Sequence, residues 1–108
     1  MSDGEAAAVA GEDRILLTVI YDSGVDERVM TLVAEHGVEG WTKLQGAHGY
    51  GGAGYKLDTP VWPGINNVLL LAVTSEKAGE LAAALRSMQR TYRRKPGITL
   101  WTQPVSLL

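Results

Sequence analysis

Two short apolar runs, each followed at once by a helix-capping residue and an amphipathic stretch, constrain the fold of this chain most strongly. Residues 14–21 read Arg-Ile-Leu-Leu-Thr-Val-Ile-Tyr, and residues 66–74 read Asn-Asn-Val-Leu-Leu-Leu-Ala-Val-Thr. Runs this short, bounded by capping residues, are typical of buried strands. The sequence therefore predicts two strand–helix units in series.

Each predicted helix has a start, an apolar face and a stop. Asp22, Ser23 and Gly24 offer an N-cap to the first helix, and Gly37 is placed to end it. Residues 74–75 can cap the second helix, and residues 96–97, a Pro-Gly pair, end it. Apolar side chains recur at spacings of three and four, which gives each helix one buried face. They are Val25, Val29, Leu32, Val33 and His36 in the first helix, and Ala78, Leu81, Ala82, Leu85 and Met88 in the second.

Two further strands complete the pattern. Residues 41–48 follow the first helix and predict a second strand, and residues 98–102 predict the last strand, which Pro104 closes. Residues 46–54 contain five glycines, so we expect neither a helix nor a regular strand there. Residues 57–64 carry two prolines and predict an irregular connection.

The order of elements is strand–helix–strand–strand–helix–strand. Right-handed crossovers then predict a ferredoxin-like βαββαβ fold of the α+β class, a four-stranded antiparallel sheet with two helices on one face and residues 66–74 at its centre. Residues 14–108 form this single domain, and the small, acidic residues 1–13 are expected to be a flexible tail. The opposite face of the sheet would be bare. Trp41 and Trp101 on strands favour a partner subunit that covers it.

Composition excludes several classes of function. The chain has no cysteine, so it has neither disulfides nor thiolate metal sites. A formal net charge of −2 argues against non-specific binding to nucleic acid, which needs a strong basic excess. No apolar run approaches the length of a membrane span, and no basic-then-apolar secretion signal opens the chain. We therefore expect a cytoplasmic protein.

Two glycine motifs carry a family resemblance. Residues 37–42, Gly-Val-Glu-Gly-Trp-Thr, resemble the Gly-x-x-Gly-[aromatic or Met]-Thr stretch that joins the first helix to the second strand in PII signalling proteins. Residues 49–51, Gly-Tyr-Gly, resemble the Gly-Phe-Gly at the base of the long PII loop. The expected order of elements matches that family over residues 14–102, so the chain resembles a divergent PII-like protein.

The chain also departs from the PII pattern. It has about one residue more between Thr42 and the Gly-x-Gly, its effector loop is shortened to about residues 50–64, and no equivalent of the modifiable tyrosine can be assigned. The Thr-Gly-x-x-Gly-Asp-Gly-Lys loop that holds nucleotide phosphates in the family is replaced by residues 92–97, Tyr-Arg-Arg-Lys-Pro-Gly. These departures point away from a true nitrogen regulator.

The resemblance implies a homotrimer that senses a small molecule in clefts between subunits and acts on an unknown protein target. The ligand would be an adenine nucleotide or a small anion such as bicarbonate. One wall of the cleft would consist of Thr42, Gly49, Tyr50 and Gly51, and a neighbouring subunit would supply the cations of Arg90, Arg93, Arg94 and Lys95.

The same residues also allow purely structural explanations. The cluster at residues 90–95 holds four of the ten basic residues, and arginine suits bidentate contact with phosphate, but cations at a helix end also complement the helix dipole. The glycine run lacks a P-loop motif and can be a plain connection. His36 is interpreted as structural, His48 is the better ligand or proton-switch candidate, and Trp62 locks the return of the loop or stacks on a base. Two histidines alone do not make a metal site.

No catalytic constellation stands out, so we expect no enzyme. Two alternatives stay open. One is a metal-tolerance-type protein or plain interaction module with the same trimeric fold, which the copper-tolerance family shares. The other is a small, dimeric enzyme of the ferredoxin-like αβ-barrel type. Thermal stabilisation by nucleotide rather than divalent metal separates the sensor from the first, and oligomer size separates it from the second.

Overall fold

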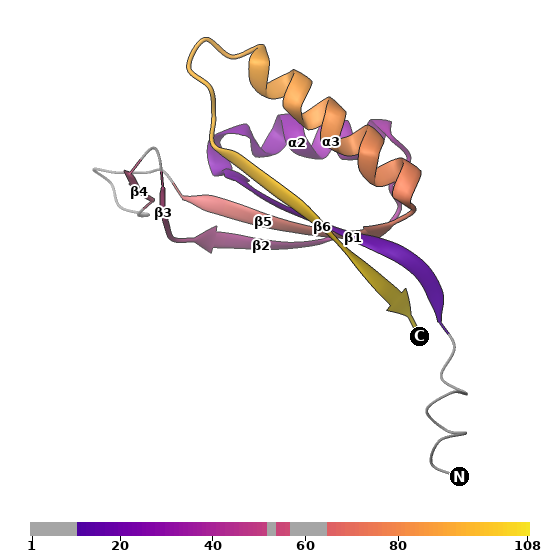
Figure 1. Cartoon of the computed structure of the whole chain (residues 1–108). Helices are drawn as coiled ribbons and strands as arrows, with labels where there is room; N and C mark the ends of the chain where they lie inside the picture. Colours follow the sequence, from indigo (N-terminus) through magenta and orange to yellow (C-terminus); the bar gives the residue numbers. More distant parts are fainter. Residues whose placement is uncertain (1–10, 52–53, 57–64) are drawn as a thin grey trace.

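The computed structural model describes residues 11–51, 54–56 and 65–108 (Figure 1). The elements follow the expected order, with a short strand pair inserted after the second strand. They are β1 (Glu12–Asp22), the 3-10 turn η1 (Ser23–Val25), α2 (Asp26–Glu35), β2 (Thr42–Ala47), β3 (Gly49–Gly51), β4 (Gly54–Lys56), β5 (Asn66–Val73), α3 (Ser75–Arg90) and β6 (Ile98–Leu107).

The main sheet has four strands in the order β2-β5-β1-β6, and every neighbouring pair is antiparallel. This order is the one that two βαβ crossovers produce when both helices pack on the same face. Figure 1 shows α2 and α3 together on one side of the sheet. The ferredoxin-like βαββαβ prediction is therefore confirmed, and β5 lies inside the sheet as expected.

The core lies between the helices and the inward face of the sheet. Alternate residues of β1 and β5 point into it, because successive side chains of a strand point to opposite faces. The helices contribute the apolar stripes that their periodicity predicts. The fully buried side chains are Leu17, Val19 and Tyr21 from β1, Leu69 and Leu71 from β5, Val29 and Val33 from α2, and Leu81 and Leu85 from α3.

The predicted capping residues lie at or near three of the four helix ends. Asp22 accepts a hydrogen bond from the Gly24 N–H and caps η1, whereas α2 itself begins after Val25 without a side-chain cap. Gly37 follows α2 with φ of +71°, a left-handed conformation that glycine adopts at no steric cost. The Thr74 hydroxyl accepts from the Lys77 N–H and caps α3.

The fourth end is different, because α3 stops at Arg90 and not at the Pro-Gly pair. Thr91 and Tyr92 turn the chain by donating their N–H groups to the carbonyls of Met88 and Gln89. Residues 93–95 therefore lie in the connection between α3 and β6, not on a helix end.

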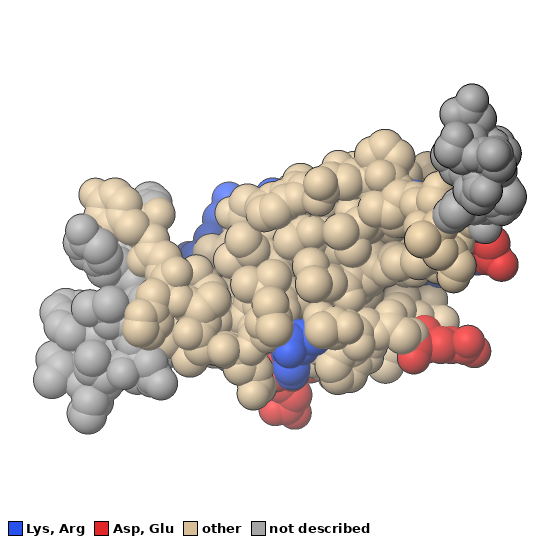
Figure 2. Space-filling model, turned by 90° about the horizontal axis from the view of Figure 1, so that it is seen from below, with Lys and Arg blue, Asp and Glu red and all other residues tan. Residues whose placement is uncertain are grey.

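The outward face of the sheet is uncovered by any described element, and we call it the open face. Figure 2, which views this side, shows tan residues over the sheet with charged residues at the margins. By strand register its centre carries Leu16, Thr18 and Ile20 of β1, Val68 and Leu70 of β5, Thr42 and Leu44 of β2, and Thr99 and Trp101 of β6. Leu44 and Trp101 are 55% and 43% exposed. The expectation of a bare, apolar face is met.

Trp41 is not on a strand, contrary to expectation, whereas Trp101 is. Trp41 directly precedes β2, at the sheet edge opposite β6, and its ring centre is 5.7 Å from Lys43 Nζ. Lys43 in turn reaches toward α2 on the helix side of the sheet. Trp41 lines a hollow of the open face with Thr42 and Leu70, so both tryptophans border that face.

Two further expected boundaries were wrong. Strand β1 begins at Glu12, inside the expected tail, because Glu12 and Asp13 pair with Leu107 and Ser106 of β6. Strand β6 runs through Pro104 to Leu107. Because β6 is an edge strand, one side of it makes no ladder hydrogen bonds. Pro104, which has no N–H, is tolerated when its nitrogen faces that side.

The glycine-rich segment does contain regular strands, contrary to expectation. Strands β3 and β4 pair antiparallel, with Gly49 opposite Lys56, Tyr50 opposite Tyr55 and Gly51 opposite Gly54. Glycine weakens a strand without forbidding its extended backbone, so a short ladder can form. The break falls instead in β2, where the register shifts between Leu44 and Ala47 and Gly46 takes φ of +78°. We call the β3–β4 pair the glycine hairpin.

Candidate functional site

The expected cations lie on a short connection that is tied down at both ends. We call residues 91–97, between α3 and β6, the basic loop. At its start, the Thr91 hydroxyl donates to the Met88 carbonyl at 2.7 Å, and Tyr92 packs against the core. At its end, the Asp22 N–H donates to the Gly97 carbonyl at 3.0 Å. The backbone of the basic loop is thus anchored to the fold at both ends.

The charged side chains of the basic loop point outward without compensation. Arg93, Arg94 and Lys95 are all exposed. Within the described part of the chain none of the three forms a hydrogen bond or an ion pair. Arg90 is also exposed, in the last turn of α3, where its charge complements the helix dipole. Three adjacent unpaired cations are chemically suited to an anion.

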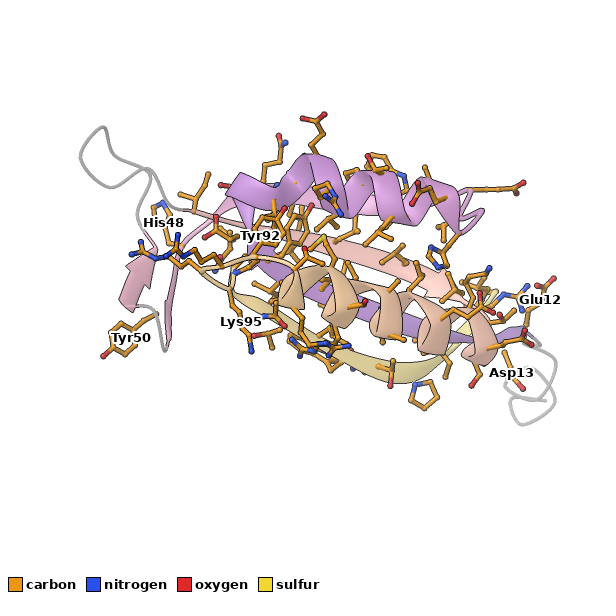
Figure 3. All side chains as sticks on the ribbon, turned by 90° about the horizontal axis from the view of Figure 1, so that it is seen from above. Glu12, Asp13, His48, Tyr50, Tyr92 and Lys95 are labelled. Carbon is orange, nitrogen blue, oxygen red and sulfur yellow. The ribbon has the colours of Figure 1, made fainter. Side chains whose placement is uncertain are left out.

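The glycine hairpin lies at the same end of the sheet as the basic loop. Figure 3 labels His48 and Tyr50 at this end together with Tyr92 and Lys95, while the acidic Glu12 and Asp13 lie at the other end. Tyr50 is 75% exposed, and a Cβ added at Gly49 would lie 3.2 Å from the Asn66 amide nitrogen. The expected residues Gly49 to Gly51 are therefore in a paired strand beside β5, and they leave the Tyr50 ring exposed.

Thr42 lies far from the cations within one chain. It is exposed on the open face and lines a shallow hollow of about 340 Å³ with Leu16, Leu70 and Ala72. Strand β2 and strand β6 are the two edges of the sheet, and three strand spacings of about 4.8 Å put them roughly 14 Å apart. A single subunit therefore does not bring Thr42 and the basic loop together.

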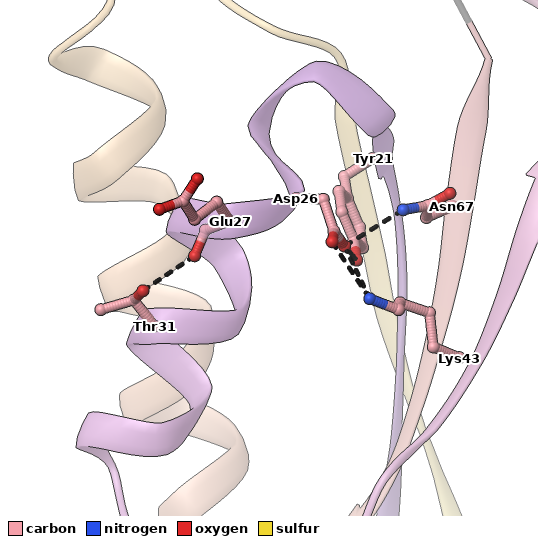
Figure 4. Close-up of polar contacts among 6 residues, drawn as sticks. All are labelled: Tyr21, Asp26, Glu27, Thr31, Lys43 and Asn67. Atoms are coloured by element: carbon pink, nitrogen blue, oxygen red, sulfur yellow. Dashed lines mark hydrogen bonds and ion pairs between the residues drawn. The ribbon is translucent and has the colours of Figure 1, made fainter.

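Sequence reasoning missed a cluster of polar groups at the start of α2, which we call the Asp26 cluster (Figure 4). The Tyr21 hydroxyl donates to Asp26 Oδ1 at 2.5 Å, and Asn67 Nδ2 donates to the same oxygen at 3.1 Å. Lys43 Nζ lies 3.1 Å from both carboxylate oxygens. One carboxylate thus joins β1, α2, β2 and β5.

The charges of the Asp26 cluster are satisfied internally. Burial on its own would raise the pKa of Asp26, but hydrogen bonds from Tyr21, Lys43 and Asn67 outweigh it and lower that pKa below its ordinary value. Burial raises the pKa of Tyr21 far above its usual range, and the adjacent carboxylate raises it further. The asparagine pair that opens an otherwise apolar strand was the available signal, since a buried amide such as that of Asn67 needs a partner.

The two histidines and Trp62, the other candidates from the sequence, differ in their surroundings. His36 places Nδ1 2.9 Å from the Leu32 carbonyl at the end of α2, as a structural residue would. His48 is exposed beside β3. Trp62 and the rest of residues 57–64 lie outside the described residues. Among the residues that are described, no group of three His, Cys, Asp or Glu side chains could hold a metal ion, and no helix could span a membrane.

The chain is similar in structure to several solved proteins. CPII from Thiomonas intermedia K12, a nitrogen regulatory PII-like protein solved with ADP, AMP and bicarbonate, gives a TM-score of 0.72 at 18% identity, covering 92% of this chain and 93% of CPII. A PII-like signalling protein from Thermus thermophilus gives 0.67 at 20% identity, over 93% and 94% of the two chains.

The apo form of CPII gives a TM-score of 0.60 at 18% identity over 86% of this chain and 91% of CPII. No protein-family model matches the sequence, and no curated protein matches it. The likeness therefore lies in the backbone, over nearly the whole length of each chain. The fold of this chain is the PII-like fold.

Proposed function

We propose that this chain is a PII-like sensor that binds an adenine nucleotide or a small anion such as bicarbonate between the subunits of a homotrimer. The observation that carries the proposal is the basic loop, which holds three exposed and uncompensated cations on an anchored backbone. Such cations can replace the phosphate-binding glycine loop that the sequence lacks. CPII, which shares the fold, was solved with ADP, AMP and bicarbonate.

The separation of the candidate residues supports a site shared between subunits. Thr42 lies at one edge of the sheet, and the basic loop leads into the other. When two copies pack side by side, the β2 edge and glycine hairpin of one subunit can meet the basic loop of the next. Thr42, Gly49, Tyr50 and Gly51 form one wall in this proposal, and Arg90, Arg93, Arg94 and Lys95 form the other.

The open face supports assembly. Among the described residues its centre carries no charged side chain, and it exposes Leu44 and Trp101 to solvent in the single chain. Contiguous apolar surface of this kind marks an interface. Light scattering should therefore return three times the 11.6 kDa chain mass at micromolar concentration. A species at the mass of one chain would refute the trimer.

A thermal-shift screen tests the ligand. ADP, AMP and bicarbonate are compared with divalent metals at fixed salt, since a ligand at a hundredfold its dissociation constant adds about 2.7 kcal/mol of stability. The sensor is expected to respond to the nucleotides or to bicarbonate. A response to metals alone would favour the metal-tolerance-type alternative, and no response at all would favour a plain interaction module.

The sensor of this proposal acts in the cytoplasm by binding alone, without a catalytic step, and passes its signal to a protein target. The dimeric αβ-barrel enzyme predicts a different oligomer. A stable dimer in the same light-scattering experiment would therefore favour that alternative over the sensor.

A further inference from the structure

Two side chains of α3 hold the exit of the basic loop. Gln89 Nε2 donates to the Pro96 carbonyl at 2.8 Å, and Arg86 Nη1 donates to the Ile98 carbonyl at 2.9 Å. The same Arg86 nitrogen donates to Gln89 Oε1 at 3.0 Å. The two side chains are partly buried and connected to each other, so they act on the loop as one unit.

The chemistry of the pair leaves a single arrangement. A guanidinium only donates hydrogen bonds, so Arg86 requires the oxygen of the Gln89 amide to face it. The amide nitrogen of Gln89 must then face the other way, toward the Pro96 carbonyl. Rotating the Gln89 amide would break both bonds at once. Arg86 therefore sets the amide orientation in which Gln89 donates to the Pro96 carbonyl.

The result is a loop whose ends are both determined. At the exit, the carbonyls of Pro96, Gly97 and Ile98 each accept from a donor outside the loop, namely Gln89, the Asp22 N–H and Arg86. At the start, the N–H groups of Thr91 and Tyr92 bond back to the last turn of α3. Between these fixed points only the three cationic residues 93–95 span the gap.

We infer that Arg86 and Gln89 are positioning residues for the anion site, and that they preset the backbone that presents Arg93 and Arg94. The inference rests on the proposed function of the basic loop. A loop already fixed in its binding shape loses less conformational freedom when the ligand arrives, so its affinity is higher. The anion they serve is a phosphate or carboxylate-type group, the class that paired arginines bind.

The test uses Gln89→Met, which removes both amide contacts while leaving every charge of the loop in place. Calorimetry at fixed salt compares ADP and inorganic pyrophosphate on the wild type and the variant. We expect an affinity loss of about fivefold, within the range of coupling between residues that act as one unit. Ser87→Met, on the same helix at an exposed position, is the matched control and should bind as the wild type does.

A purely structural role is separated by a double-mutant cycle. In the background of Arg93→Gln with Arg94→Gln, Gln89→Met should cost less than about twofold, because the cations it positions are gone. Equal losses in both backgrounds would overturn the inference. So would wild-type affinity in Gln89→Met when the double Gln variant itself binds weakly.

Hydrogen exchange supplies a readout that does not depend on any ligand. The amides of residues 93–95 and 97 should exchange faster in Gln89→Met, and also in Arg86→Met, with no change in β5. Unchanged exchange, or unfolding of both variants, would overturn the inference. A wild type that binds neither of these anions, nor AMP or bicarbonate, but shows the exchange effect would refute the proposed function and, with it, the role in binding. It would still show that Arg86 and Gln89 hold the loop.

Discussion

The Asp26 cluster and the basic loop treat charge in opposite ways at the same end of the molecule. In the cluster, the Asp26 carboxylate accepts hydrogen bonds from Tyr21, Lys43 and Asn67, so its negative charge is compensated within the fold. In the loop, Arg93, Arg94 and Lys95 face solvent without a partner among the described residues. Paired charge holds elements together, whereas unpaired charge on a fixed backbone is available to a ligand.

The backbone is anchored in both regions, so the difference lies in the side chains alone. Lys43 is 15% exposed and reaches across the sheet to a helix. The loop cations have no acidic partner among the described residues. The contacts that fix the loop are made by backbone carbonyls and by the side chains of Gln89 and Arg86 instead. The cluster should therefore govern stability, and the loop should govern binding.

The largest expected effect comes from Asp26→Ala. The change leaves the Lys43 ammonium and the buried Tyr21 hydroxyl without their shared acceptor. Stability should fall by about 2 kcal/mol, less than for a fully buried pair because the Asp26 side chain is 29% exposed. Urea unfolding at neutral pH measures the loss.

The control is Glu27→Ala, the same substitution one residue along in the same first turn, where the side chain is exposed. It should change stability by no more than about 0.5 kcal/mol, as exposed positions usually do. Equal losses in the two variants would mean that the cluster contributes no more than the helix dipole does.

The next effect is on binding. Arg93→Gln with Arg94→Gln removes two charges and keeps most of each stem. Ligand affinity should fall at least about tenfold, or roughly 1.4 kcal/mol, because charge-assisted hydrogen bonds are the stronger kind. Calorimetry with ADP at fixed salt measures it, and the unfolding midpoint should match that of the wild type. Unfolding of the double variant would instead make the loop cations structural.

The fold was largely predictable because it depends on local patterns. The apolar runs, the Thr74 cap and the Gly37 stop each have a physical signal within a few residues. The errors fell where a neighbouring strand decides the outcome. Glu12 and Pro104 are in strands because β1 and β6 pair along their whole length, and no local pattern shows that pairing.

The site was predictable in its residue types but not in its architecture. The basic cluster is visible in the sequence, yet the early stop of α3 at Arg90 is not, because Thr91 and Gln89 act through specific hydrogen bonds. In the Asp26 cluster, Asp26 bonds to Lys43, which lies 17 positions further along the chain, and to Asn67, which lies 41 positions further along. Such long-range contacts depend on the packed fold, so composition and spacing do not reveal them.

A smaller binding effect is expected for Thr42→Val. The change removes one neutral hydroxyl from the hollow on the open face and leaves the shape of the side chain nearly unchanged. Affinity should fall by about fivefold or less, in line with about 1 kcal/mol for a neutral hydrogen bond. Calorimetry under the same conditions as for the arginine variant compares the two. A loss larger than that of the double Gln variant would place Thr42, not the cations, at the centre of the site.

The smallest effect is a pH dependence that belongs to the Asp26 cluster and not to the basic loop. The pKa of Asp26 is lower in the folded chain than its ordinary value, so the folded state favours the ionised carboxylate. The stability this adds is fully present above the unfolded-state pKa of about 3.9 and is lost as the pH falls through the lower folded pKa.

The wild type should therefore lose more stability than Asp26→Asn as the pH falls from neutral to below the ordinary carboxyl pKa of about 3.9. Urea unfolding of both proteins across this range measures the difference. The double Gln variant of the basic loop should follow the wild-type curve, because the Asp26 carboxylate bonds only to Tyr21, Lys43 and Asn67 among the described residues. A parallel decline of wild type and Asp26→Asn would show that the paired carboxylate adds nothing that protonation can remove.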